Sequence, residues 1–183
     1  MSKDCIEMIK SRQSIRKFTS ESIPDSIIED IADIGRSAPS GGNRQPWRIV
    51  IVTEENLKNQ LVAASHNQQF VAVAPVVYVV CAVPEESAER YKERGRNLYT
   101  LQDTAALTLN ILFGAHLHGY GACWIGSFNE EEVSKILNIP SDMRPVAIVP
   151  VGKIDGIPVG LQIFAPAFKE KLLFDVMKAI EEL

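Results

Sequence analysis

Cysteine is scarce in this chain. The 183 residues include three, Cys5, Cys81 and Cys123, each isolated among apolar neighbours. An odd number of widely spaced cysteines does not indicate a disulfide framework, and their spacing matches no metal site. We therefore expect the three side chains to be buried as small hydrophobic groups in a reducing compartment.

A basic excess is also missing. The formal net charge of −4 argues against non-specific binding to nucleic acid. The exception is the start of the chain, which carries Lys3, Lys10, Arg12, Arg16 and Lys17 against Asp4 and Glu7. A small basic region on an otherwise acidic chain suits a small anionic ligand better than a polyanion.

Long hydrophobic runs are absent too. Apolar stretches such as Val71–Val83 contain proline and fall short of the roughly 20 residues that cross a bilayer. Met1–Lys10 is short and charged, unlike a signal peptide. The hydrophobic content of 46% and charged content of 23% are typical of a globular domain. We expect one domain over residues 1–183, cytoplasmic and without a membrane partner.

The motifs of several common catalytic sites cannot be found. The sequence has no Walker loop, no Gly-x-Gly-x-x-Gly after a strand and no defensible Ser/His/Asp or Cys/His/Asp arrangement. His116 and His118 end a helical pattern two residues apart, so they diverge there and cannot share a metal. No metal site is expected. A chain without an internal nucleophile is expected to take its chemistry from a cofactor.

The segment Ser37–Trp47 is unusual in what it contains. It reads Ser-Ala-Pro-Ser-Gly-Gly-Asn-Arg-Gln-Pro-Trp and joins a helical pattern to the apolar strand expected at Trp47–Val52. Gly41 and Gly42 allow positive φ and close approach, whereas Pro39 and Pro46 restrict the backbone. The segment favours a rigid surface for a flat or anionic ligand, and the alternative is an ordinary multiple turn.

A second segment, Arg12–Phe18, has β-branched and aromatic residues that favour an extended backbone. In an extended strand the side chains of Arg12, Ser14 and Arg16 project to one face. Two guanidinium groups and a hydroxyl then match the oxygens of a phosphate. The alternative is a solvated basic strand.

Two further loops carry polar or glycine-rich sequence. His66–Gln69 presents amides, which can pair with the edge of a heterocycle because each offers a donor and an acceptor. Gly119–Phe128 contains three glycines, which suggests close backbone approach. For the His66–Gln69 loop the alternative is an ordinary solvent-exposed connection.

The remaining patterns indicate helices and strands. Val76–Cys81 is expected to be a strand covered on both faces. Thr53 is expected to cap a helix that runs to Ala64, and Asn129 the helix that ends at Leu137. Leu98–Leu117 is apolar nearly all round, which predicts a buried helix. Pro84–Arg96 alternates acids and bases, so it is a solvent-facing helix or a mobile flap, and Lys169–Leu183 is a helix.

Together these segments resemble the nitroreductase family of flavin enzymes. Ser11–Phe18 resembles the family's Arg-Arg-Ser-Ile-Arg-x-Phe, and Ser37–Trp47 its Ala-Pro-Ser-Gly-Gly-Asn-x-Gln-Pro-Trp. Gly119–Phe128 resembles its Gly-x-Gly-x-Cys-Trp-Ile-Gly-x-Phe. The resemblance implies an α+β fold, with a mixed central β-sheet flanked by helices. It also implies an intertwined homodimer with two FMN sites shared between the subunits.

The resemblance also implies roles for single residues. Arg12, Gln13 and Ser14 would hold the phosphate and ribityl end of FMN. Arg16 and Asn67 would lie at the pyrimidine edge of the ring, and Ile125 and Gly126 near N5. The other subunit would contribute Pro39, Ser40, Gly41 and Asn43. No side chain is assigned as catalytic, although Arg16 can stabilise the negative charge of reduced flavin.

The implied reaction is hydride transfer from NADH or NADPH through flavin N5 to a nitroaromatic, quinone or similar small molecule, in a ping-pong sequence. Alternatives are flavin cleavage, dehalogenation or dehydrogenation on the same fold, and a flavin-binding protein without turnover.

Two features of the sequence depart from the family pattern. Phe70 stands where larger relatives often have a cation, and only Lys169 and Lys171 could supply a C-terminal basic pair. With only Pro84–Arg96 as a possible lid, we expect broad substrate selection.

Overall fold

The computed structural model describes residues 3–156. The helices are α1 (Lys3–Ser11), α2 (Asp25–Arg36), α3 (Glu55–Ala64), α4 (Phe70–Val73), α5 (Pro84–Arg94), α6 (Thr100–Leu117) and α7 (Glu130–Leu137), with a 3₁₀ turn η1 (Gly41–Asn43) and a π-helical turn η2 (Gly95–Tyr99). The strands are β1 (Trp47–Val52), β2 (Val76–Ala82), β3 (Gly121–Ala122) and β4 (Arg144–Gly152). The helix expected over Lys169–Leu183 lies outside the described residues.

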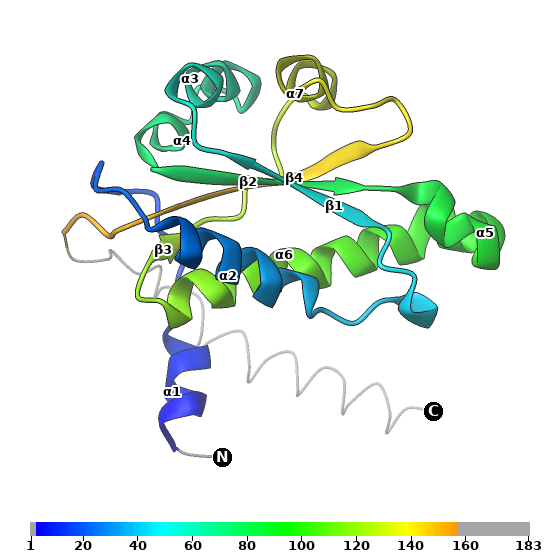
Figure 1. Ribbon diagram of the computed structural model, residues 1–183, viewed down its shortest axis with the longest axis horizontal. Coiled ribbons are helices and arrows are strands. Elements are labelled where there is room, and N and C mark those ends of the chain that lie inside the picture. The colour runs from blue at the N-terminus through cyan, green and yellow to red at the C-terminus, as the bar shows by residue number, and fades with distance from the viewer. Residues whose placement is uncertain (1–2, 157–183) are drawn as a thin grey trace, which may run out of the picture.

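The four strands form one sheet in the order β1-β2-β4-β3, and each pair of neighbouring strands is antiparallel. The parallel component of the sheet is a bridge between Ser14 and Ala122. Helices cover both faces (Figure 1). The predicted fold class, a mixed central sheet flanked by helices, is confirmed.

Strand β2 lies at the centre of two apolar clusters. All seven of its residues are buried, as predicted for a strand covered on both faces. Val76, Tyr78 and Val80 face the cluster that includes α2 and α6, and the alternate residues Val77, Val79 and Cys81 face α3 and α7. This two-residue alternation places α2 and α6 on one side of the sheet and α3, α4 and α7 on the other (Figure 1).

Helix α6 departs from its expected burial. Leu107 and Ile111 are fully buried, but Leu101, Leu109 and Leu117 are 40%, 42% and 55% exposed in the single chain. These three leucines recur every eight residues and lie on one ridge of the helix, which follows every fourth position. The expectation of burial all round is therefore wrong for one chain alone. An apolar ridge runs along the outer side of α6.

The helix caps agree only in part with the sequence. Asn129 caps α7, because its side-chain oxygen accepts a hydrogen bond from the Glu132 backbone N–H at 3.1 Å. Glu54, and not Thr53, is the residue that precedes α3, and its side chain makes no capping hydrogen bond. Helix α3 is held instead by burial of Leu61 and Val62 against the sheet.

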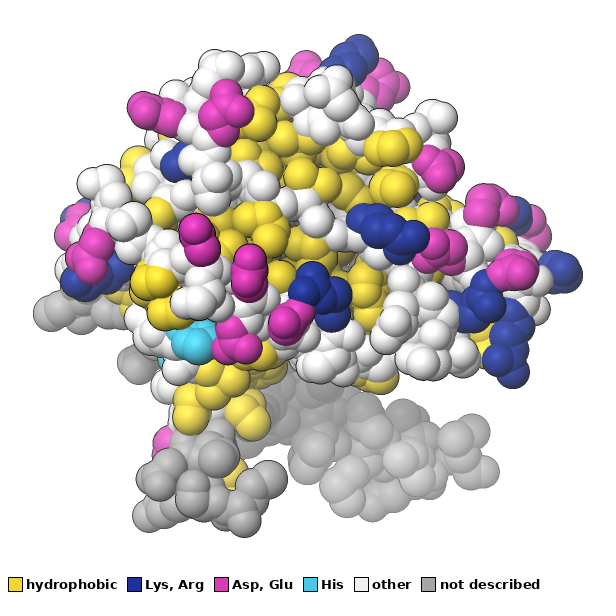
Figure 2. Space-filling view, viewed as in Figure 1, with side chains coloured by type: hydrophobic (Ala, Val, Ile, Leu, Met, Phe, Trp, Pro, Cys, Tyr) yellow, Lys and Arg dark blue, Asp and Glu magenta, His cyan; other side chains and the backbone are white. Residues whose placement is uncertain are grey.

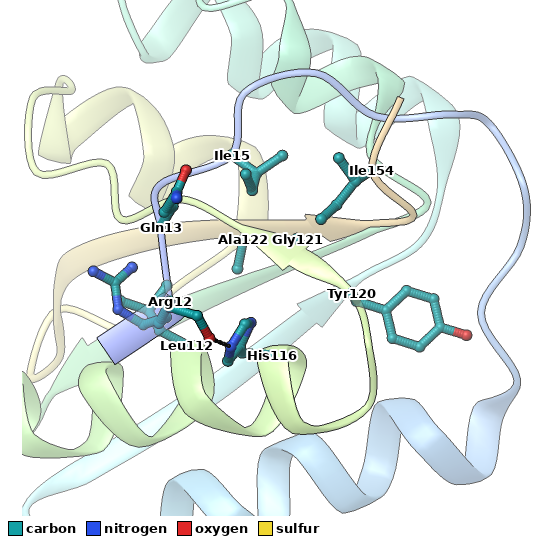
Figure 3. A pocket seen from close by; sticks show the side chains of 10 residues that line it. Arg12, Gln13, Ile15, Leu112, His116, Tyr120, Gly121, Ala122 and Ile154 are labelled. Carbon is teal, nitrogen blue, oxygen red and sulfur yellow. Dashed lines mark hydrogen bonds between the residues drawn. The ribbon is translucent and has the colours of Figure 1, made fainter. Parts of the chain in front are cut away.

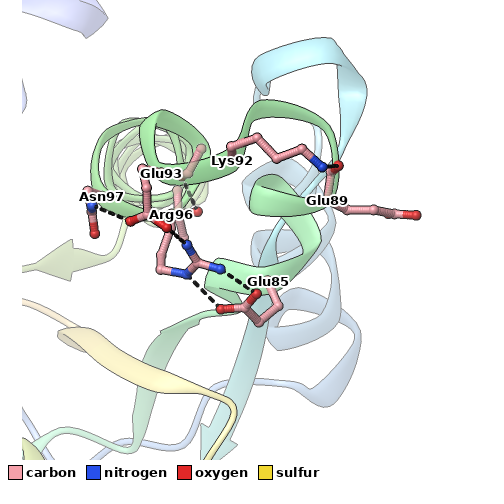
Figure 4. A network of polar contacts seen from close by, with 8 residues as sticks. Glu85, Glu89, Lys92, Glu93, Arg96 and Asn97 are labelled. Carbon is pink, nitrogen blue, oxygen red and sulfur yellow. Dashed lines mark hydrogen bonds and ion pairs between the residues drawn. The ribbon is translucent and has the colours of Figure 1, made fainter.

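The charged helix α5 is fastened at several points. Arg96 lies between Glu85, at 2.8 Å, and Glu93, which also accepts from Asn97 at 3.1 Å (Figure 4). Glu86 pairs with Arg48 of β1, and Glu89 pairs with Arg44 of the loop before β1. Charged side chains accordingly cluster around α5 at the right of Figure 2, beside the apolar surface over β1.

Within residues 3–156, no helix has both the length and the apolar character that crossing a membrane requires.

Gly121 is required for the close packing of β3. A Cβ atom at this position would lie 2.8 Å from Cβ of Ile15 and 2.9 Å from Ile154. At Gly126 an added Cβ meets no atom within 4 Å. We expect Gly121→Ala to lower the free energy of unfolding of the apoprotein by about 1–3 kcal/mol in urea titrations. The matched variant Gly126→Ala should change it by less than about 0.5 kcal/mol. Equal midpoints for the two variants would contradict the packing seen at Gly121.

Candidate functional site

The Arg12–Phe18 segment is extended and attached to the sheet. The Ile15 backbone N–H donates to Ala122 O at 2.9 Å, and Ile15 and Phe18 are buried. Ser14 and Arg16, on either side of Ile15, are exposed, and Arg12 is half-buried. The predicted two-residue alternation does not extend along the whole segment, because Gln13 and Lys17 are exposed as well. The apolar side chains thus anchor the segment and leave the polar ones available.

Arg12, Ser14 and Arg16 lie near enough to the thiol of Cys123 to act on its pKa. Burial raises the pKa of this thiol, whereas the charges of Arg16 and Arg12, and hydrogen bonding from Arg16 and Ser14, act in the opposite direction. Neither arginine forms an ion pair with a residue of the described part of the chain. Two uncompensated guanidinium groups and a hydroxyl at one place are suited to bind an anion.

Gln13 lines a small cavity next to this cluster. The cavity, of about 100 Å³, is also bounded by Ile15, His116 and Tyr120 (Figure 3). His116 Nε2 lies 3.1 Å from both Ser11 Oγ and the Met8 carbonyl oxygen, so it ties the end of α1 to the end of α6. The position of Arg12 and Gln13 therefore depends on a histidine that the sequence analysis considered only as a metal ligand.

The loops that carry Asn67 and Gly126 lie side by side. Gln68 Nε2 donates to Ser127 O at 3.5 Å, and the Asn129 N–H donates to Ala64 O at 2.8 Å. Asn67 is exposed with φ of 62°, and Gly126 is exposed with open space beside it. The neighbouring Ile125 is buried, and its N–H donates to Ile148 O at 2.9 Å.

Phe70, where the family resemblance led us to look for a cation, begins α4 next to the Asn67 loop. Its ring lies 6.4 Å from that of Phe18, so the position supports apolar packing under the Arg12–Phe18 segment. Lys169 and Lys171, the candidates for a further basic pair, lie outside the described residues.

The Ser37–Trp47 segment forms a rigid turn rather than a simple connection. Gly42, Asn43 and Gln45 have φ of 57°, 56° and 50°, all in the left-handed region. Ser40 Oγ accepts from the Gln45 N–H at 2.9 Å, which closes the turn. Pro39 and Asn43 are exposed, whereas Ser40 and Gly41 are half-buried. The exposed groups form a polar surface on a constrained backbone.

One chain does not bring this turn to the Arg12 cluster. The turn contacts α6 near its start, where the Gly41 N–H donates to Asp103 Oδ1 at 3.0 Å. The Arg12 segment adjoins the other end of α6 through His116. Residues 103 and 116 are separated by about 20 Å of helix, and Figure 1 shows the two regions at opposite ends of α6.

Sequence reasoning missed Asp103 and two tyrosines that support the turn. The ring of Tyr99 lies under Gly41, and the hydroxyl of Tyr91 lies where a side chain at Gly42 would be. The rings of Tyr91 and Tyr99 meet edge to face at 5.0 Å between centroids. Asp103 could have been found, because it is the single acidic residue within the apolar pattern Leu98–Leu117. The described residues contain no cluster of three His, Cys, Asp or Glu that could hold a metal ion.

The cysteines of the described core are expected to be unreactive. Cys81 is fully buried, and burial raises its pKa to about 11. Cys123 is also buried, whereas the side chain of Cys5 lies outside the described part.

In a Cys5→Ser variant at pH 8, we expect a thiol reagent to label neither Cys81 nor Cys123 until urea unfolds the protein. Because the folded pKa of Cys81 exceeds its ordinary 9.0, the free energy of unfolding should fall as pH rises from about 9 to about 11. Rapid labelling of the folded protein at pH 8 would contradict this burial.

Comparisons with known proteins agree with the fold and the motifs. The model of the Nitroreductase family matches residues 9–75 and 63–153. A protein of Archaeoglobus fulgidus, provisionally named NADH dehydrogenase/NAD(P)H nitroreductase, is 33% identical over 153 residues, which cover 81% of this chain and 84% of that protein. An iodotyrosine deiodinase of Haliscomenobacter hydrossis is 25% identical, with coverage of 80% and 77%.

A solved structure gives the same result. The NADPH:FMN oxidoreductase of Vibrio harveyi, complexed with NAD⁺, superposes with a TM-score of 0.79 at 27% identity, over 89% of this chain and 74% of that one. The family model covers most of the described chain, and the fold and the three sequence motifs agree with it. This chain belongs to the nitroreductase family.

Proposed function

We propose that this chain is an FMN-dependent oxidoreductase that takes hydride from NADH or NADPH and reduces a nitroaromatic, a quinone or a similar small acceptor. Bound FMN would supply the chemistry, because its N5 accepts and returns hydride. The observation that carries the proposal is the convergence of Arg12, Ser14 and Arg16, where two arginines have no acidic partner in the described residues. We also propose a cytoplasmic location, consistent with the exposed polar surface of the described chain.

The groups at this position fit a phosphorylated ligand. Arg12 and Ser14 would hold the phosphate through charge-assisted hydrogen bonds, and Gln13 would contact the ribityl chain from the adjoining cavity. Burial of Ile15 and Phe18 fixes the backbone that carries them. A backbone that is already held in place would lower the ordering cost of binding such a ligand.

The ring would lie against the two adjacent loops. Asn67 would pair with the pyrimidine edge, and the open space beside Gly126 would receive the flat ring near N5. Arg16 would stabilise the negative charge that reduction leaves at the pyrimidine end, because a cation held beside a developing negative charge stabilises it. None of these side chains is assigned a covalent role.

We propose that two copies complete each site. The Pro39–Asn43 surface and the Arg12 cluster adjoin opposite ends of α6, so one copy cannot supply both to one ligand. The ridge of Leu101, Leu109 and Leu117 joins these two ends and exposes apolar surface along its length. Packing of this ridge against a second copy would bury the leucines and bring Pro39, Ser40, Gly41 and Asn43 to the partner's ring.

The region around α5 supports broad acceptor selection. Helix α5 and η2 adjoin the Pro39–Asn43 surface together with the start of α6. The ion pairs of Glu86 with Arg48 and of Glu89 with Arg44 attach α5 to the body of the chain. A fastened helix of this size would cover little of the ring. We propose that the acceptor site remains open to several flat molecules.

A second reaction type is supported by one relative. The deiodinase of Haliscomenobacter hydrossis is 25% identical, so a reductive dehalogenation on the same site is the alternative. Flavin cleavage, dehydrogenation and flavin binding without turnover are the remaining alternatives. Anaerobic addition of NADH to the yellow protein separates turnover from flavin binding alone. Bleaching of the visible absorbance supports an oxidoreductase, whereas an unchanged spectrum favours a non-catalytic flavin-binding protein. A second experiment compares NADH oxidation in the presence of a nitro compound, which supports the proposed reaction, with oxygen-dependent loss of flavin, which favours cleavage.

Removal of single ligand groups is expected to weaken FMN binding. Arg12→Ala and Asn43→Ala should each raise the dissociation constant by about tenfold or more, because each removes a hydrogen bond or charge contact worth about 1.5 kcal/mol. Flavin content after purification and fluorescence titration of the apoprotein measure the effect. Arg36→Ala is the control, since Arg36 pairs with Asp33 on an exposed helix surface. Unchanged flavin content in both site variants would refute the site.

Steady-state kinetics test the shared slot for donor and acceptor. With NADH and a nitroaromatic acceptor varied together, double-reciprocal plots should give parallel lines, because the oxidised nicotinamide leaves before the acceptor binds. Intersecting lines would show that both substrates are bound at once and would contradict the ping-pong order.

A further inference from the structure

Asp103 is the one acidic side chain that is buried in the part of the chain with described burial. Its residue is 7% exposed, and Oδ1 accepts a hydrogen bond from the Gly41 N–H at 3.0 Å. Its Oδ2 is buried and has no hydrogen-bond partner among the described residues. Burial raises the pKa of Asp103, and the Gly41 hydrogen bond acts against that rise. A carboxyl group retained at such a cost requires a physical reason.

The hydrogen bond to Gly41 anchors a loop that is otherwise bonded to itself. Within Pro39–Asn43, the Asn43 N–H donates to Ser40 O at 3.0 Å, and Ser40 Oγ is used by Gln45. Among the described residues, the Asp103 contact is the one hydrogen bond that joins Pro39–Asn43 to a distant part of the chain. The direction of the loop relative to α6 is therefore defined by this carboxyl group.

Neighbouring groups support the loop without replacing this bond. Tyr99 lies under Gly41, and its hydroxyl accepts from Arg94 Nε at 3.0 Å; no hydrogen bond joins it to the loop backbone among the described residues. Asp103 forms no ion pair within the described residues, so its contact is with the backbone and not with a cation. Aromatic packing holds the loop close to α6, whereas a hydrogen bond also defines its orientation.

We propose that Asp103 is a positioning residue that acts across the dimer interface: by holding the Gly41 N–H, it presents the Ser40–Asn43 loop to the flavin held mainly by the partner subunit. This inference rests on the proposed function, because it requires shared FMN sites. It assigns Asp103 to the site of the other copy, and not to the site built by Arg12 of its own chain.

Two substitutions of Asp103 distinguish the effect of its side-chain shape from the effect of its hydrogen bond to Gly41. Asp103→Leu removes the acceptor, and we expect it to raise the FMN dissociation constant by about tenfold or more. Asp103→Asn keeps an acceptor oxygen of the same shape, so the dissociation constant should stay within about threefold of the wild-type value. Thermal unfolding of both apoproteins establishes that each variant is folded. Equal affinity of Asp103→Leu and the wild type would overturn the proposal.

The donor side gives an independent variant. Gly41→Pro deletes the N–H, and Ser40 already has the extended backbone, φ −143° and ψ 155°, that a residue before proline adopts. Gly41→Ala is its steric reference, because an added Cβ makes only ordinary contacts, the nearest at 3.5 Å. If the two groups form one interaction, Asp103→Leu should add little to the loss already caused by Gly41→Pro. Full additivity of the two losses would contradict a shared interaction.

Mixed dimers test the action across the interface. Differently tagged chains are co-expressed, and only dimers with both tags are collected and titrated with FMN. In the first dimer, one chain carries Arg12→Ala and the other Asp103→Leu, so both defects fall in one site and the second site is intact. In the second dimer, one chain carries both substitutions and its partner is wild type, so each site has one defect.

We expect the first dimer to bind one FMN with wild-type affinity. The second dimer should have no site of wild-type affinity. The reverse result would place the effect of Asp103 in the site of its own chain and overturn the proposal. Absence of a wild-type site in both dimers would indicate a general loss of structure and would also overturn it. Wild-type homodimer titrated in parallel distinguishes this failure from failure of the proposed function, because a wild-type protein that ignores FMN ends both.

Discussion

Burial of β2 on both faces is the constraint on which the rest of the structure depends. Each of its residues is withdrawn from water, and alternate side chains face two separate apolar clusters. Removal of apolar surface from water stabilises the fold by about 25 cal/mol per Å². A strand that is apolar on both faces gains this stabilisation in full only when a layer of helices covers each face. The loops that carry Asn67 and Gly126 are connections of these layers, so their position follows from packing far from any ligand.

Helix α6 has a second role, because it determines the distance between the two groups of ligand-type residues. It packs closely on α2, since Gly35 lies against Ile111 and Gly114 lies against the backbone of Ile31. This close contact holds the two helices as one unit, from whose ends the Ser37–Trp47 segment and the Arg12 cluster are presented. Residues that touch no ligand therefore define where the ligand groups can be.

Local rules predicted the elements whose structure is decided locally. The apolar run at Val76–Cys81 was sufficient to identify β2. The two-residue period expected for Arg12–Phe18 holds only around Ile15, because Gln13 and Lys17 are exposed and Phe18 is buried. The break at Lys92, with φ of 52° and ψ of −137°, and the π-helical turn that follows could not be predicted, because they depend on how α5 meets the start of α6. The bond between Gly41 and Asp103 joins positions 62 residues apart, and no periodicity connects them. The exposed leucines of α6 look like core residues in the sequence, since periodicity does not distinguish a core from an uncovered apolar surface.

The position of β1 at the end of the strand order has a consequence for the behaviour of the protein at high concentration. Among residues 3–156, this short apolar strand has a neighbour on one side alone, and its residue Ile51 is 40% exposed. Unpaired strand edges of this kind can template sheet-to-sheet association between molecules. Pro46, directly before the strand, offers no N–H, and the charge of Arg48 lies within the strand beside Glu86. Proline and charge at such positions oppose association, so we expect colloidal stability to depend on two residues outside the proposed ligand site.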